Sequence, residues 1–274
     1  MGPPTPPPQP ELSPELPGRG RLLSWGTLER APWWMLALLI GGLLALLGIL
    51  GSPVYRETYN FLAPAVIVTL KLAFAAYGLA MILGLIAALG QLSSHPVPYT
   101  LARLYVEVVR GVPLLVQLIY IAFVVTPVLA DLTGQRWLRS DMVRATLGLG
   151  IGYGAYLAEI YRAGIQSIPR GQTEAARSLG MSPWLAMRHV ILPQAIRVIL
   201  PPLGNDFVAM LKDSSLASVI SVQELTYTGS LLNARTFRSF ETYNMVALLY
   251  LIMTLLGSLG VRGLERWAGK GYRH

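Results

Sequence analysis

Cysteine is absent from this 274-residue chain, and charged residues are scarce. The lack of cysteine excludes disulfides, thiolate metal sites and a catalytic thiol, and leaves the redox compartment unreadable. Charged residues make up 13% of the sequence against 53% hydrophobic residues, and the mean hydropathy is +0.51. A soluble protein of this length needs more charged residues than this to cover its surface. The composition therefore predicts an integral membrane protein.

Proline is concentrated at the N-terminus, from Pro3 to Pro17. Such spacing predicts an extended, disordered tail over residues 1–30. No basic region leads directly into a short apolar run with a small-residue cleavage site, so a cleaved signal peptide is not expected. A tail without a specific partner is the simpler interpretation.

Hydropathy predicts six membrane-spanning helices and hence an all-α fold. About 20 residues are needed to cross the hydrocarbon core. The fifth segment is short and contains Arg197, Pro201 and Pro202, so we expect it to be a broken helix. The predicted spans are residues 33–51, 65–89, 112–130, 142–160, 195–211 and 245–261.

Basic residues predict the orientation. They are more numerous on the side of the spans that holds residues 167–193, which places that segment and both termini in the cytoplasm. Topology and anionic lipid account for much of the formal charge of +8 without nucleic acid. No interleaved basic and aromatic pattern argues for a nucleic-acid partner.

A charged insert, SIPRGQTEAARSLGMSPWLAMRHVILP, occupies residues 167–193 between apolar segments. Ser167 is predicted to cap a first helix, and Gly180 is predicted to end it in a left-handed conformation. Ser182 repeats the start signal, and Pro193 is predicted to interrupt the second helix. The pattern indicates a helical hairpin of fixed geometry.

The first helix of this hairpin has a small, smooth face formed by Ala175, Ala176 and Leu179. Glu174 and Arg177, at i and i+3, are placed to pair with each other or to meet a partner. A docking surface for a soluble protein and an ordinary solvated loop are equally compatible with this pattern.

Charges inside the spans are costly and usually face a bundle interior or a water-filled path. Glu107 and Arg110 are three residues apart, as are Glu159 and Arg162, so each pair could be a local ion pair. For Glu107 we favour that interpretation. For Arg110 a functional role is equally open, because the following Gly111 and Pro113 predict a break that exposes backbone donors.

One face of the fourth span presents Tyr153, Tyr156 and Glu159 at three-residue steps. A hydrogen-bonded packing face and a binding face explain this spacing equally well.

The fifth span places Asn205, Ala209 and Lys212 on one face, with Asp206 and Asp213 on the neighbouring one. A broken helix near the midplane is typical of transporters. A zwitterion would suit this site, with its carboxylate toward Lys212 and its ammonium toward an acidic group. Alternatively, the segment LKDSS ends the span at the outer interface and Lys212 snorkels.

Four stretches resemble one family, the permease subunits of bacterial ABC importers of the polar amino acid uptake type. The resemblance covers residues 62–264. It rests on EAARSLGMSPWLAMRHVILP from Glu174, YVEVVRGVPLLVQL from Tyr105, AYLAEIYRAGIQSIPRGQ from Ala155 and NDFVAMLKDSSLASVI from Asn205. The residues that fit the family pattern in the first stretch are Glu174, Ala175, Ala176, Gly180, Val190, Ile191, Leu192 and Pro193.

The resemblance implies a five-helix transmembrane domain over residues 62–264 with a cytoplasmic coupling-helix hairpin. Residues 31–61 would then be an extra N-terminal transmembrane helix and loop, and residues 265–274 a basic cytoplasmic tail. The ATPase-coupling residues would be Glu174, Ala175, Ala176, Arg177, Gly180, Met181 and Ser182. The candidates for the substrate path are Arg110, Glu159, Asn205, Asp206, Lys212 and Asp213, and no catalytic or metal-binding residue is expected.

The implied assembly is a homo- or heterodimer of permease subunits in the inner membrane, bound to two ATPase subunits. An extracytoplasmic solute-binding protein would supply an amino acid, and lipid would surround the helices. The chain lacks GxxxxGK[ST], so it binds no nucleotide itself and is not an enzyme. ATP and Mg²⁺ would be held by the ATPase.

Other classes of transporter remain as alternatives. An importer for another small polar solute would have the same architecture. An ion-coupled secondary transporter would normally carry internal repeats, and we find no convincing similarity between the two halves. A channel or a membrane anchor would need neither a docking hairpin nor a charged, broken span.

Overall fold

The computed structural model describes residues 2, 40–42, 44, 48 and 51–269. It separates into one unit of residues 1–51 and another of residues 52–274. The predicted tail, residues 1–30, lies outside the described residues except for Gly2. The described positions of the predicted first span, residues 33–51, are helical. The second unit contains the long helices and the candidate site.

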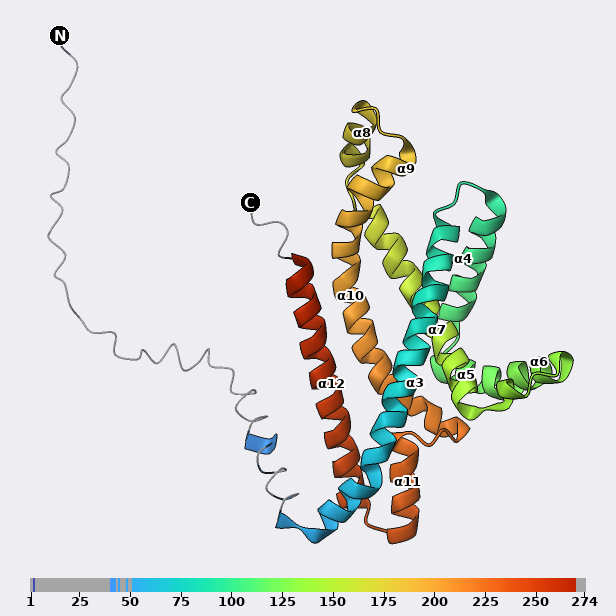
Figure 1. The fold of residues 1–274 in the computed structure, drawn as a ribbon, viewed down its shortest axis with the longest axis vertical. Helices are drawn as coiled ribbons and strands as arrows, with labels where there is room; N and C mark the ends of the chain where they lie inside the picture. The colour runs from blue at the N-terminus through green and yellow to red at the C-terminus, as the bar shows by residue number, and fades with distance from the viewer. Residues whose placement is uncertain (1, 3–39, 43, 45–47, 49–50, 270–274) are drawn as a thin grey trace. The chain divides into compact units, whose positions relative to one another are not determined.

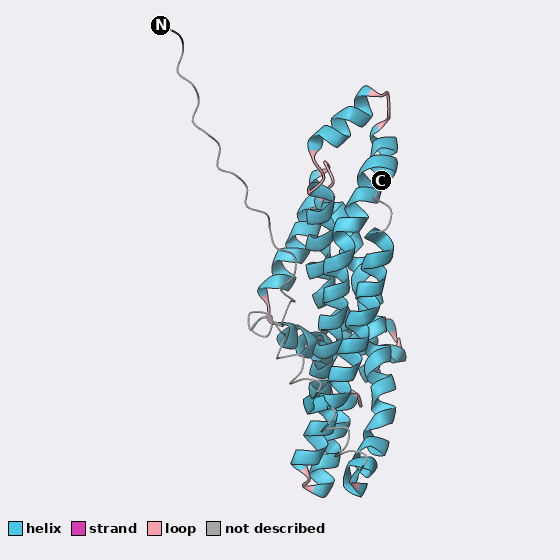
Figure 2. Cartoon of the chain, turned by 90° about the vertical axis from the view of Figure 1, so that its left-hand side faces the viewer, coloured by secondary structure: helices cyan, strands magenta, loops and turns pink. Residues whose placement is uncertain are grey.

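Within its described residues the second unit is built from helices alone (Figure 2). Two short π-helices and two short 3-10 helices lie between the α-helices. In chain order the elements are α3 (Pro53–Gln91), α4 (Pro96–Gly111), α5 (Leu114–Tyr120), the π-helix η1 (Ile121–Val125), α6 (Thr126–Thr133), the 3-10 helix η2 (Arg136–Arg139), α7 (Asp141–Gln166), α8 (Arg170–Ser178), α9 (Pro183–Ala186), the π-helix η3 (Met187–Ile191), α10 (Leu192–Asp213), the 3-10 helix η4 (Ser214–Ile220), α11 (Leu225–Thr236) and α12 (Ser239–Gly269).

Three described segments are long and apolar enough to cross a membrane: Pro53–Gln91, Leu114–Thr133 and Ser239–Glu265. They correspond to the predicted spans 65–89, 112–130 and 245–261. The predicted spans 142–160 and 195–211 also form helices, α7 and α10, whose more polar composition lowers their hydropathy. The total of six spans stays a prediction.

The first described helix of this unit starts earlier than expected. α3 begins at Pro53, next to Ser52 at its N-cap, so the predicted domain boundary at residue 62 falls inside a helix. Proline is well tolerated in the first helical turn, where its missing N–H group has no partner to lose. Similarly α12 runs on to Gly269, through the predicted start of the basic tail at residue 265.

The core forms where α3 and α7 pack along their length, with α10 and α12 beside them. Small residues allow this approach: a Cβ added at Gly84 would lie 2.8 Å from the Cβ of Leu157. Leu72, Leu149 and Met210 are fully buried and belong to the same core cluster as Leu157. Close packing through small residues is the usual basis of helix association in membranes.

The predicted break in the fifth span is wrong. Helical backbone runs without interruption from Pro183 to Asp213, through Pro201 and Pro202. Pro193 does not stop the helix either, because the π-helix η3 precedes it. A π-turn widens the helix where the proline ring would meet the carbonyl of the previous turn. The regular helix changes only at Ser214, where η4 begins.

The two ends of the bundle differ. In Figure 1, α8 and α9 lie at the upper end of the long axis, and α11 with the start of α12 lies at the lower end. The segment from α5 to α6 projects away from the bundle, and α6 packs chiefly against its chain neighbours η1 and η2.

Candidate functional site

The hairpin at the upper end closes through Gly180, which has φ +82°. Its N–H group donates to the carbonyl of Arg177 at 3.0 Å, and the N–H group of Met181 donates to the carbonyl of Ala176 at 3.1 Å. This pattern ends α8 as glycine C-caps do. The left-handed turn predicted at Gly180 is confirmed.

The two serine caps have different outcomes. The hydroxyl of Ser182 accepts from the N–H group of Leu185 at 3.3 Å, so this predicted cap is confirmed. Ser167 instead ends α7, where its hydroxyl donates to the carbonyl of Gly164 at 2.8 Å. Its predicted role as the cap of the next helix is wrong, because α8 begins only at Arg170, after Pro169.

The hairpin presents an apolar and charged outer surface. Leu179 is 80% exposed and Trp184 is 67% exposed. Glu174 and Arg177 are also exposed, and neither forms an ion pair within the described part of the chain. Ala176 is buried inside the hairpin, so the expected smooth face does not include it.

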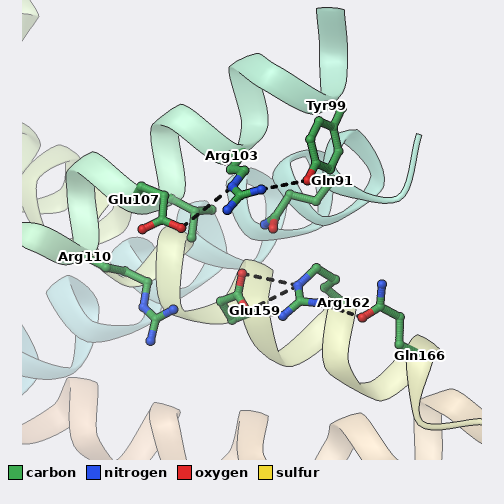
Figure 3. A pocket seen from close by; sticks show the side chains of 9 residues that line it. Gln91, Tyr99, Arg103, Glu107, Arg110, Glu159, Arg162 and Gln166 are labelled. Atoms are coloured by element: carbon green, nitrogen blue, oxygen red, sulfur yellow. Dashed lines mark hydrogen bonds and ion pairs between the residues drawn. The ribbon is translucent and has the colours of Figure 1, made fainter. Parts of the chain in front are cut away.

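A polar cleft of about 330 Å³ opens between the C-terminal end of α3, α4 and α7 (Figure 3). Three arginines and two glutamates converge on it. Its lining residues are Gln91, Tyr99, Arg103, Val106, Glu107, Arg110, Glu159, Arg162 and Gln166. Of the predicted substrate-path residues, the structure places Arg110 and Glu159 here.

Glu159 and Arg162 form the tighter of the two ion pairs in the cleft, with 2.6 Å between Oε2 and the guanidinium nitrogen. Their side chains are 26% and 32% exposed. Arg162 also donates to Gln166 Oε1 at 2.6 Å. The local pairing expected for Glu159 and Arg162 is therefore confirmed, and it lies on the wall of the cleft.

Glu107 and Arg110 do not pair with each other, contrary to the prediction. Glu107 instead lies 3.9 Å from Arg103, one turn earlier on α4, and both side chains are largely exposed. The Arg110 guanidinium lies 5.6 Å from the ring centroid of Tyr156 on α7. A cation over an aromatic face is a favourable contact that still leaves N–H donors free.

The predicted break after Arg110 is present, since α4 ends at Gly111 and α5 begins at Leu114. The sequence predicts exposed backbone N–H donors at this break, whereas the structure shows a side chain that satisfies backbone carbonyl groups there. The buried side chain of Gln117 donates to the carbonyls of Val109 and Val112, both at 2.6 Å. These carbonyl groups lose their helical partners at the break, and the Gln117 amide satisfies them.

The four candidates on α10 lie outside the cleft. Asp213 accepts a hydrogen bond of 2.7 Å from Tyr153 on α7. Asn205 and Lys212 are exposed, and within the described residues neither their side chains nor that of Asp206 form a hydrogen bond or an ion pair. The structure thus divides the predicted set into a cleft group and an α10 group.

The face of α7 identified in the sequence connects the two groups. Tyr153 contacts Asp213, Tyr156 lies under Arg110, and Glu159 faces the cleft. The sequence is compatible with a packing face and with a binding face. The structure combines the two, since Tyr153 packs against α10 and Glu159 lines the cleft.

Sequence reasoning missed Gln91, Tyr99 and Arg103 as members of the site. They come from α3 and α4, and only the fold brings them opposite α7. Arg103 could have been noticed because it precedes Glu107 by one helical turn. No group of three metal-ligating side chains occurs among the described residues.

A helical bundle with a charged cleft between helices and an exposed hairpin at one end defines a membrane transport subunit. Residues 80–274 match the family described as "Binding-protein-dependent transport system inner membrane component". The chain belongs to this family. It is the permease subunit of an ABC importer, a transport component rather than an enzyme, which lies in the membrane and works with ATPase subunits.

Several permease proteins are similar to this chain. A probable amino-acid permease, YxeN of Bacillus subtilis (strain 168), is 39% identical over 79% of this chain and 95% of its own. The glutamine permease GlnP of Escherichia coli (strain K12) is 40% identical over 68% and 83%. The arginine permease ArgU of Corynebacterium glutamicum is 35% identical over 87% and 80%.

Solved structures agree with the fold. One is titled as an amino acid ABC transporter with histidines; it is 41% identical, covers 77% of this chain and 95% of its own, and gives a TM-score of 0.70. An inward-facing form of the MetNI methionine ABC transporter gives a TM-score of 0.64 at 19% identity, over 76% and 96%. At that identity the second comparison supports the fold alone.

Proposed function

We propose that this chain forms the translocation path of an ATP-driven amino acid importer. The observation that carries this proposal is the cleft between α3, α4 and α7, in which guanidinium and carboxylate groups face one space. Relatives named for glutamine and arginine transport support the same substrate class.

The cleft suits a zwitterion. Arg110 has free guanidinium donors over Tyr156 and would bind the substrate carboxylate, for which arginine is the preferred bidentate partner. Glu159 would receive the substrate ammonium in exchange for part of its pairing with Arg162. Asn205, Asp206, Lys212 and Asp213 on α10 would line the continuation of the path.

The hairpin of α8 and α9 would dock on the ATPase. Its exposed Leu179 and Trp184 offer the apolar surface that such a contact needs. Glu174 and Arg177 would add charged contacts, with Ala175, Ala176, Gly180, Met181 and Ser182 setting the shape of the turn. ATP and Mg²⁺ would be bound by the ATPase pair, whose closure would move the hairpins.

The full importer would contain two permease chains, identical or different, two ATPase subunits and an extracytoplasmic solute-binding protein. The bias of basic residues supports a cytoplasmic hairpin and cytoplasmic termini. This orientation places the α11–α12 end of the bundle outside the cell.

Reconstitution of the complex in liposomes tests the proposal. We expect uptake of a labelled amino acid that requires internal ATP and external binding protein. Uptake driven by an ion gradient without ATP would overturn the proposal. Transport of another small polar solute, with no amino acid accepted, would keep the ATP-driven mechanism and overturn the substrate class.

A further inference from the structure

The turn between α11 and α12 exposes an aromatic side chain in an unusual backbone conformation. Phe237 is 87% exposed and has φ +54°, the left-handed region that bulky residues rarely adopt. Phe240, on the first turn of α12, is 74% exposed. Neither the backbone conformation nor the exposure of these rings favours folding.

The turn is held firmly in this shape. The N–H group of Phe237 donates to the carbonyl of Asn233 at 2.8 Å, and the Ser239 hydroxyl donates to Asn233 Oδ1 at 2.8 Å. Arg238 pairs with Glu57 on α3 at 3.5 Å. The two hydrogen bonds hold the turn in this conformation and present the ring of Phe237, whereas the exposed Arg238–Glu57 pair shows only that the turn lies next to α3.

The length and composition of α3 place this turn beyond the lipid. α3 has 39 residues, so it is about 58 Å long, whereas a bilayer with its headgroups is about 45 Å thick. Its first two turns contain Arg56, Glu57 and Asn60, and the rest of the helix has Lys71 as its charged residue. The polar N-terminal turns therefore project from the membrane, and the pair with Glu57 shows that the turn of Phe237 lies next to them.

We infer that Phe237 is an anchor for the extracytoplasmic solute-binding protein. This inference rests on the proposed function, which places the α11–α12 end outside the cell. The family description itself states dependence on a binding protein. Phenylalanine and arginine are among the residues that are enriched at protein–protein interfaces.

The partner surface has a definite chemistry. Phe237 and Phe240 would enter an apolar pocket, and the exposed Arg235 would meet carboxylates on its rim. Charge complementarity at a rim mainly raises the association rate and makes it salt-dependent.

Two matched variants test the anchor in nanodiscs that hold the complete complex. Phe237→Asn removes the ring but tolerates the left-handed backbone. Leu132→Asn makes the same change at a side chain that is 79% exposed at the end of α6. We expect the Kd of the amino-acid-loaded binding protein to rise at least tenfold for F237N and to be unchanged for L132N. The thermal midpoint of the complex should be unchanged in both.

A benzoyl-phenylalanine photoprobe at position 237 supplies a second measurement. We expect a cross-link to the binding protein. An unchanged Kd for F237N, or cross-links only to lipid or to the second permease chain, would overturn the inference while ATP-dependent uptake by the wild-type complex still stands. If uptake by the wild-type complex does not depend on a binding protein, both the proposed function and the role of Phe237 as an anchor are wrong.

Discussion

Two ion pairs line the same cleft and differ in how far water reaches them. The pair of Glu159 with Arg162 is short and two-thirds or more shielded, whereas Glu107 and Arg103 are 3.9 Å apart and mostly exposed. An exposed pair contributes about 0–1 kcal/mol. A shielded carboxylate interacts more strongly with a charged ligand, because less water screens it. At the scale of single residues, the carboxylate of Glu159 should therefore interact more strongly with a charged substrate than the carboxylate of Glu107.

Replacing Glu159 with Gln tests this difference. In the proposed path the substrate ammonium loses its carboxylate partner, so we expect uptake to fall at least tenfold, which corresponds to about 1.4 kcal/mol. Uptake by reconstituted liposomes measures it. Glu107→Gln in the same cleft is the matched control and should transport normally. Wild-type uptake by E159Q would remove Glu159 from the path.

Replacing Gly180 with Val tests the hairpin turn. The φ of +82° would cost a branched residue about 1–2 kcal/mol, and the turn between α8 and α9 should change shape. We expect loss of substrate-stimulated ATP hydrolysis in the reconstituted complex. Gly171→Ala on α8, where an added Cβ meets nothing within 4 Å, should leave stimulation intact. Normal stimulation in G180V would show that the turn is dispensable for coupling.

At the scale of helices, the sequence predicts more of the fold than of the site. Apolar segment length predicts the long helices, and glycine chemistry predicts the turn at Gly180. Pro201 and Pro202 suggest a break in the fifth span, yet α10 runs through both, because neighbouring helices and local adjustments satisfy the backbone groups that proline frees in a membrane helix. The cleft could not be assembled from sequence, since Gln91 and Arg103 meet Glu159 only through packing between helices.

The crossing of α7 and α10 depends on Gly164. A Cβ at this position would overlap the Cγ1 atom of Ile199, so Gly164→Ala should destabilise the fold by about 1–3 kcal/mol through overpacking. Ile199→Ala alone should also destabilise it, by leaving a cavity. We expect the double variant to be more stable than the sum of the two changes predicts. Thermal unfolding in detergent measures this, and strict additivity would contradict the close contact.

At the scale of the whole molecule, the hairpin and the bundle are joined by continuous helix. The backbone from Pro183 to Asp213 contains no loop, so in the proposed mechanism movement of the hairpin would be carried directly into α10. The sequence-based interpretation placed a proline break at this junction, which would have separated the two parts.

Inserting two glycines between Met187 and Arg188 tests the rigid connection. We expect the ATPase to remain bound, because the hairpin surface is intact, and uptake to be lost, because the helix is interrupted. The same insertion after Gly134, in the exposed turn before η2, is the control and should preserve uptake. Transport by the first insertion variant would show that continuity of this helix is not required.

The π-helix η3 has a further consequence for the direction in which the hairpin faces. A π-turn accommodates one more residue than an α-turn. The wider turn absorbs that residue, so deleting one residue between Met187 and Ile191 would restore regular α-helix and leave the hairpin facing nearly the same way. Deleting one residue from a regular stretch of α10 would instead rotate the hairpin by about 100° around the helix axis. A length difference of one residue between permeases should therefore be tolerated at η3, whereas the same difference elsewhere in this helix would turn the surface that faces the ATPase.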